Sequence, residues 1–116
     1  DEWEDLQPWG CFLEENSVGY TSVRRLKDRP VLVTYSEKDD LVITATERQS
    51  IPKLCAQGYR IEYLECAGLG HTDGALASLP YMRKWIDDRV AGVPLNQAVN
   101  CMVRPAVDCS DPSVMP

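Results

Sequence analysis

The only histidine of the chain, His71, stands in a glycine-flanked loop at residues 67–72, directly after a strand-like run. The preceding strand-like run is also followed by a loop, and this one carries the carboxylates Asp39 and Asp40. In open α/β sheets, functional side chains gather in loops at the carboxyl ends of the strands. A carboxylate at that position can accept the imidazole Nδ1–H, fix its tautomer and stabilise the imidazolium that forms on protonation. An acid followed by a histidine is the order of the last two members of a Ser-His-Asp triad.

Asp39 is predicted to be the acid, with Asp40 as the neighbouring candidate. An apolar residue, Val42, stands three positions after Asp39, where the loop can tuck into the core. A single histidine or aspartate in a loop is more often an ordinary surface residue. The order of the two residues, their strand context and their separation of 32 positions together favour a catalytic pair.

Two short apolar runs are expected to form neighbouring strands. Residues 31–34 are β-branched and apolar without alternation, which is typical of a strand buried on both faces in a parallel sheet. Residues 61–64 form the centre of the second strand. Two strands are too few for an independent parallel sheet, so the pattern predicts the end of a larger α/β domain.

Helices are expected after each strand, giving the strand–helix rhythm of an α/β sheet. Residues 46–57 read as a helix stopped by Gly58, with a kink or a restart capped by Ser50 because Pro52 lies inside. The second helix is expected to start at Ser78 as its N-cap and to end at Gly92. One face of this helix is expected to pack in the hydrophobic core, and it carries Met82, Trp85, Ile86 and Val90.

Three segments follow from this pattern: a connector at residues 1–29, an α/β segment at residues 30–92 and an irregular tail at residues 93–116. The connector is expected to hold a short helix that ends near Asn16. The tail carries four prolines and two cysteines, which favours irregular chain pinned by disulfides. Asp1 is interpreted as a mature or processed start.

The composition excludes several classes of partner. The net charge of −6 argues against nucleic acid or an anionic membrane surface, where a basic patch is expected. No apolar run approaches the ~20 residues that span a bilayer. Five cysteines without a C-x-x-C pair, beside one histidine, favour disulfides over a zinc site and hence a secreted protein. The odd number leaves one cysteine free or paired with another chain.

The residues described above resemble a known family. The run Pro30-Val31-Leu32-Val33-Thr34-Tyr35-Ser36-Glu37-Lys38-Asp39-Asp40-Leu41-Val42 resembles the acid-bearing segment of α/β hydrolases, and Gly68-Leu69-Gly70-His71 resembles their histidine loop. The helix end at residues 54–58 and the helix exit at residues 85–94 are similar to fungal secretory lipases of the Candida lipase A type. The resemblance covers residues 16–94, and many relatives have glycine where Ser36 stands. It implies the last two strands of an α/β-hydrolase sheet, with Asp39 and His71 as catalytic residues and no metal or organic cofactor.

The nucleophile of that family is missing from this sequence. The family's Gly-x-Ser-x-Gly elbow precedes the acid and the histidine, and none of the seven serines has that context. The resemblance therefore implies a partner, a larger N-terminal chain of the same precursor that carries the serine and the oxyanion hole. Cys11 is a candidate for an interchain disulfide. Cys55 or Cys66 could hold the tail through Cys101 or Cys109, and the spacing leaves this connectivity open.

Three functions remain open at this level. The first is a secreted serine esterase or lipase that hydrolyses carboxylic esters. The second is a peptidase or acyltransferase that uses the same triad. The third is a disulfide-stapled binding module without catalysis.

Overall fold

The computed structural model describes residues 7–16, 29–111 and 113. The elements follow the order α1 (Trp9–Asn16), β1 (Pro30–Ser36), α2 (Thr44–Ala56), β2 (Arg60–Cys66) and α3 (His71–Val90). Most of the expected connector, including residues 17–28, lies outside the described residues.

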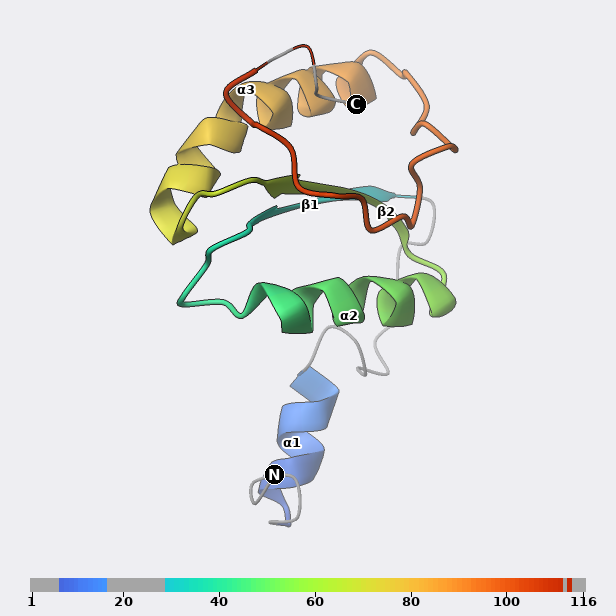
Figure 1. Ribbon diagram of the computed structural model, residues 1–116. Coiled ribbons are helices and arrows are strands. Elements are labelled where there is room, and N and C mark those ends of the chain that lie inside the picture. The colour runs from blue at the N-terminus through green and yellow to red at the C-terminus, as the bar shows by residue number, and fades with distance from the viewer. Residues whose placement is uncertain (1–6, 17–28, 112, 114–116) are drawn as a thin grey trace.

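The two strands form one parallel sheet between two helices. Strand β1 pairs with β2 from Pro30↔Arg60 to Ser36↔Cys66, so both strands end at the same level. Helix α2 covers one face and α3 covers the other, while α1 lies beyond α2 (Figure 1). This confirms the prediction of an α/β fold with a two-stranded parallel portion of a hydrolase sheet.

Successive side chains of a strand point to opposite faces of the sheet, so the two strands contribute to two apolar clusters, one on each face. On the α2 side, Ile61 and Tyr63 pack with Ile51. On the α3 side, Leu64 and Cys66 pack with Tyr81. Residues 31–34 lack polar alternation because Val31 and Val33 pack on the α2 side and Leu32 packs on the α3 side.

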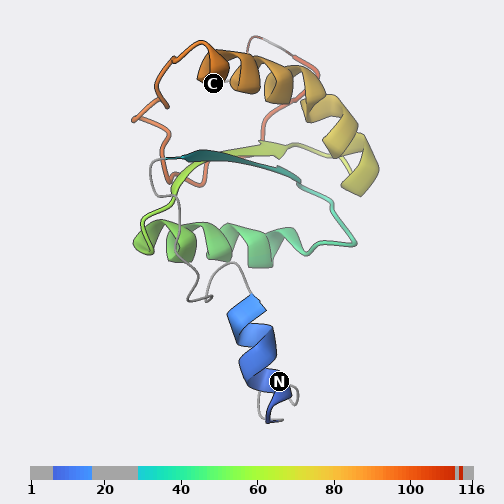
Figure 2. The same ribbon diagram turned by 180° about the vertical axis from the view of Figure 1, so that it is seen from behind.

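The two outer edges of the sheet differ. The tail lies along β2, where the Cys101 N–H donates to the Ile61 carbonyl at 2.6 Å and the Val107 N–H donates to the Glu65 carbonyl at 2.9 Å. In the part of the chain that the structure describes, no segment pairs with the outer edge of β1, which faces the viewer in Figure 2. Six of the seven β2 residues are accordingly buried, but only Ser36 is buried in β1.

Two disulfides hold the tail, as expected, and they settle the connectivity. The pairs are Cys55–Cys101 and Cys66–Cys109, which join α2 and the end of β2 to the tail. Cys11 is a free, exposed cysteine.

Helix α2 corrects the expectation of a restart at Ser50. It is a single helix that begins two residues earlier than predicted, at Thr44, with Pro52 inside it. The Ser50 hydroxyl donates to the Glu47 carbonyl at 2.8 Å, a bond back along the helix rather than a cap.

Helix α3 corrects both its predicted start and its predicted face. It begins at His71, and Ser78 is an interior residue whose hydroxyl donates to the Ala75 carbonyl at 2.9 Å. The buried face is centred on Gly74, Ser78 and Tyr81. Trp85 packs on this cluster, but Ile86 is 54% exposed and Val90 is 84% exposed, so the prediction that these two belong to the core is wrong.

Candidate active site

The acid loop folds around the side chain of Asp39. Asp39 lies three residues after the end of β1, and its backbone N–H donates to the Ser36 carbonyl at 3.2 Å. Its Oδ1 accepts the backbone N–H groups of Leu41 at 3.0 Å and Val42 at 2.9 Å. An aspartate side chain commonly organises a turn in this way. Only 5% of the Asp39 side chain is exposed, so its second oxygen is held in a fixed direction.

The second carboxylate oxygen points at the histidine. Asp39 Oδ2 lies 2.8 Å from His71 Nδ1, and the two residues are 32 positions apart in the chain. An ionised carboxylate can only accept a hydrogen bond, so Nδ1 carries the proton. The other ring nitrogen, Nε2, then has the lone pair that a general base needs. The His71 side chain is 44% exposed, so this nitrogen can be reached.

The surroundings of Asp39 keep it ionised. The hydrogen bond from the Val42 backbone N–H is the largest cause that lowers the pKa of Asp39 below its ordinary value. The contact with His71 and the N–H of Leu41 lower the pKa further, against the opposing effect of desolvation. The Asp39 carboxylate therefore stays ionised, as it must be to accept the hydrogen bond from His71 Nδ1–H.

The acid loop and the histidine loop are hydrogen-bonded to each other. The Glu37 N–H donates to the Cys66 carbonyl at 2.9 Å, and the Lys38 N–H donates to the Leu69 carbonyl at 2.9 Å. The Gly68 N–H donates to the Glu37 carboxylate at 2.7 Å. Because β1 and β2 end in register, these bonds begin directly where the strands stop.

A close contact between α3 and β1 sets the position of the histidine. A Cβ placed on Gly74 would lie 1.9 Å from Ser36 Oγ and 2.8 Å from Ser36 Cβ. Only glycine allows the first turn of α3 to approach the end of β1 this closely. His71 is the first residue of the same turn, so this contact brings its ring to Asp39.

A small hollow lies beside the pair, on the β1 side of the sheet. No residue of β2 lines it. Its lining comes from the end of β1, the acid loop and the first turn of α3: Thr34, Tyr35, Ser36, Asp39, Val42, His71, Gly74 and Ala75.

Of the residues expected from the sequence, the structure brings Asp39 and His71 together. Asp40 is exposed, and within the described residues its carboxylate has no hydrogen-bond partner. Two further residues at this site were not predicted from the sequence: Glu37, whose carboxylate accepts the Gly68 N–H, and Gly74, which packs against Ser36. A glycine one turn after the histidine was the available signal for the second of these.

Neither a metal nor a membrane span is indicated within the described residues. These residues contain no group of three or more His, Cys, Asp or Glu side chains that could hold a metal ion. Among the same residues, no helix is long and apolar enough to cross a membrane.

Comparison with protein families matches residues 9–98 of the chain to the model for secretory lipases. The chain belongs to the secretory lipase family. Comparisons of this secretory lipase chain with curated proteins and with solved structures gave no match. The matched region contains both strands, all three helices and both loops, so the carboxylate–imidazole pair lies inside the family region. Membership indicates a function of the lipase or esterase type.

Proposed function

We propose that this chain supplies the acid and the general base of a serine esterase or lipase of the Candida lipase A type. The observation that carries the proposal is the 2.8 Å contact between Asp39 Oδ2 and His71 Nδ1 at the carboxyl end of the sheet. His71 Nε2 would accept the proton of a serine hydroxyl as it attacks the ester carbonyl, and would then protonate the leaving alcohol. Asp39 would hold the tautomer and stabilise the imidazolium.

The serine would come from a partner chain, the larger N-terminal product of the same precursor. The 116 residues contain no Gly-x-Ser-x-Gly elbow. The hollow beside His71 is lined from β1, whose outer edge has no described neighbour. An additional strand paired with β1 would continue the sheet and bring its own carboxyl-terminal loop to this hollow.

Helix α1 would form a second contact with that partner chain. It exposes Trp9, Phe12 and Leu13 to between 56% and 62%. It also carries the free, exposed thiol of Cys11, while the other four cysteines are paired. An apolar helix face beside an unpaired thiol supports the interchain disulfide, and two disulfides support secretion into an oxidising compartment.

The test uses the assembled protein and a fluorophosphonate, which labels activated serines. We expect one adduct by mass spectrometry, on a serine outside the 116 residues, together with hydrolysis of a p-nitrophenyl ester. In the assembled His71→Ala variant, kcat should fall about 10⁴-fold or more. Thr72→Ala, at the next position in the same turn, should retain kcat. An adduct on a serine of this chain, or retained activity in His71→Ala, would contradict the proposal.

A further inference from the structure

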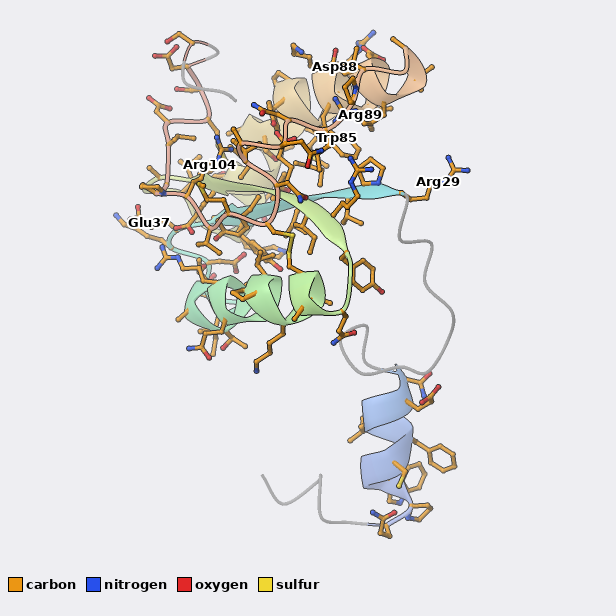
Figure 3. The ribbon with its side chains drawn as sticks, turned by 90° about the vertical axis from the view of Figure 1, so that its right-hand side faces the viewer. Arg29, Glu37, Trp85, Asp88, Arg89 and Arg104 are labelled. Carbon is orange, nitrogen blue, oxygen red and sulfur yellow. A yellow bond between two sulfur atoms is a disulfide. The ribbon has the colours of Figure 1, made fainter. Side chains whose placement is uncertain are left out.

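We propose that Glu37 is a positioning residue that holds the histidine loop in register with the acid loop. The proposal rests on the catalytic roles of Asp39 and His71 proposed above. Glu37 is the first residue after β1, at the opposite end of that strand from Arg29 (Figure 3).

The side chain of Glu37 reaches across to the other loop. Its Oε2 accepts the backbone N–H of Gly68 at 2.7 Å, joining residues that lie 31 positions apart. Gly68 has φ +69°, so the histidine loop turns sharply at the residue that Glu37 holds. The turn is followed by Leu69 and Gly70, and then by His71 as the first residue of α3.

Glu37 acts beside backbone hydrogen bonds that truncation of its side chain leaves in place. The Glu37 N–H and the Lys38 N–H hold the carbonyls of Cys66 and Leu69, each at 2.9 Å. Those bonds fix the histidine loop on either side of its turn, and the Glu37 carboxylate fixes the turn itself. A carboxylate bonded to a backbone N–H forms a charge-assisted hydrogen bond, shorter and stronger than a neutral one.

The position of this contact links it to catalysis more than to folding. Glu37 is exposed, so in Glu37→Ala the released Gly68 N–H can bond to water. The turn would then sample displaced positions and would carry the His71 ring with it. Proton transfer depends steeply on such displacements, because a misplacement of about 1 Å can cost about a hundredfold in rate.

The experiment compares Glu37→Ala, Glu37→Gln and Asp40→Ala in the assembled protein. Asp40→Ala is the matched control because it removes a carboxylate from the same loop at an exposed position. Glu37→Ala should lower kcat by about threefold to tenfold, the equivalent of one hydrogen bond, with KM and Tm close to wild type. Glu37→Gln keeps an acceptor oxygen and should recover most of the rate. The Nδ1–H proton resonance of His71, identified by its loss in His71→Ala, should shift or broaden in Glu37→Ala alone.

Two results would overturn the positioning role. One is a Glu37→Ala variant with wild-type kcat and an unchanged His71 resonance. The other is a Glu37→Gln variant as impaired as Glu37→Ala, which would mean that the accepted hydrogen bond is not what matters. Activity retained in His71→Ala would refute the proposed function and not the contact of Glu37 with the histidine loop. That contact would then be tested through the backbone amide resonance of Gly68, which Glu37→Ala should still shift.

Discussion

The contact between Gly74 and Ser36 makes a sharp prediction about how α3 is seated. In Gly74→Ala the new methyl group would lie 1.9 Å from Ser36 Oγ and 2.8 Å from Ser36 Cβ. Rotation about χ1 of Ser36 can move its Oγ but not its Cβ, so the overlap cannot be relieved by a rotamer change. Ser36 is 3% exposed, and its Cβ is held in place by the backbone of β1. The first turn of α3 must therefore move away from β1.

The expected cost follows from two opposing effects. Overpacking of a buried contact costs about 1–3 kcal/mol, and alanine regains about 0.5–1 kcal/mol over glycine inside a helix. We expect Gly74→Ala to lower the free energy of unfolding by about 2 kcal/mol, since the overlap is severe. In a Ser36→Gly background the closest remaining contact is the Cα of residue 36, at 3.4 Å. There Gly74→Ala should be neutral or stabilising by up to about 1 kcal/mol.

A double-mutant cycle measures this coupling directly. The free energy of unfolding is measured by urea titration of the assembled wild type, both single variants and the double variant, and kcat is measured on the same samples. Gly74→Ala should also lower kcat, because the displaced turn carries His71, and Ser36→Gly should restore kcat together with stability. Equal effects of Gly74→Ala in both backgrounds would show that the two residues do not meet, and would refute this account of how the histidine is placed.

Two further predictions concern the support of the sheet. Arg48 Nε donates to Glu65 Oε2 at 2.8 Å, and the Glu65 side chain is fully buried, so Arg48→Met should lower the free energy of unfolding by about 1–3 kcal/mol near pH 7. Arg48 lowers the pKa of Glu65 below its ordinary value of 4.5, so this stabilisation is present above that pH and is lost as the pH falls through the folded-state pKa. The difference between variant and wild type in urea titrations should therefore shrink as the pH is lowered below 4.5 and through the folded-state pKa, and a constant difference would contradict the assignment to this ion pair. Cys66 and Cys109 are 43 positions apart, so replacing both with alanine should lower the free energy of unfolding by about 4 kcal/mol on the chain-entropy estimate. An unchanged urea midpoint would mean that the disulfide contributes nothing to the folded tail.

The strands and the acid–histidine pair could be predicted because their signals are local. Residues 31–34 have the composition of a buried parallel strand, and a lone histidine after the next strand has few alternative partners. The choice of Asp39 was supported by the placement of Val42, but Val42 contributes through its backbone N–H, while Leu41 beside it is 73% exposed. Sequence patterns do not show which backbone groups a loop turns toward a carboxylate.

The start and the buried face of α3 could not be read from the sequence, because a tertiary contact decides them. Pro80 predicts a first helical turn after Ser78, whereas the helix begins at His71, directly after the extended Gly70. Its buried side follows from the approach of Gly74 to Ser36, a contact between distant parts of the chain. With Gly74 facing the sheet, Ile86 and Val90 lie on the exposed side of α3, although their spacing alone is compatible with a core face.

The catalytic assignment is tested most directly by the kcat of assembled Asp39→Asn beside assembled Asp40→Asn. The asparagine oxygen can still accept the N–H groups of Leu41 and Val42, so the loop should keep its shape. Its amide group would face His71 Nδ1 as a donor and would place the ring proton on Nε2, where the lone pair is needed. The account predicts a fall in kcat of about 10⁴-fold for Asp39→Asn and wild-type kcat for Asp40→Asn. An Asp39→Asn variant within about tenfold of wild type, or a comparable loss in Asp40→Asn, would contradict it.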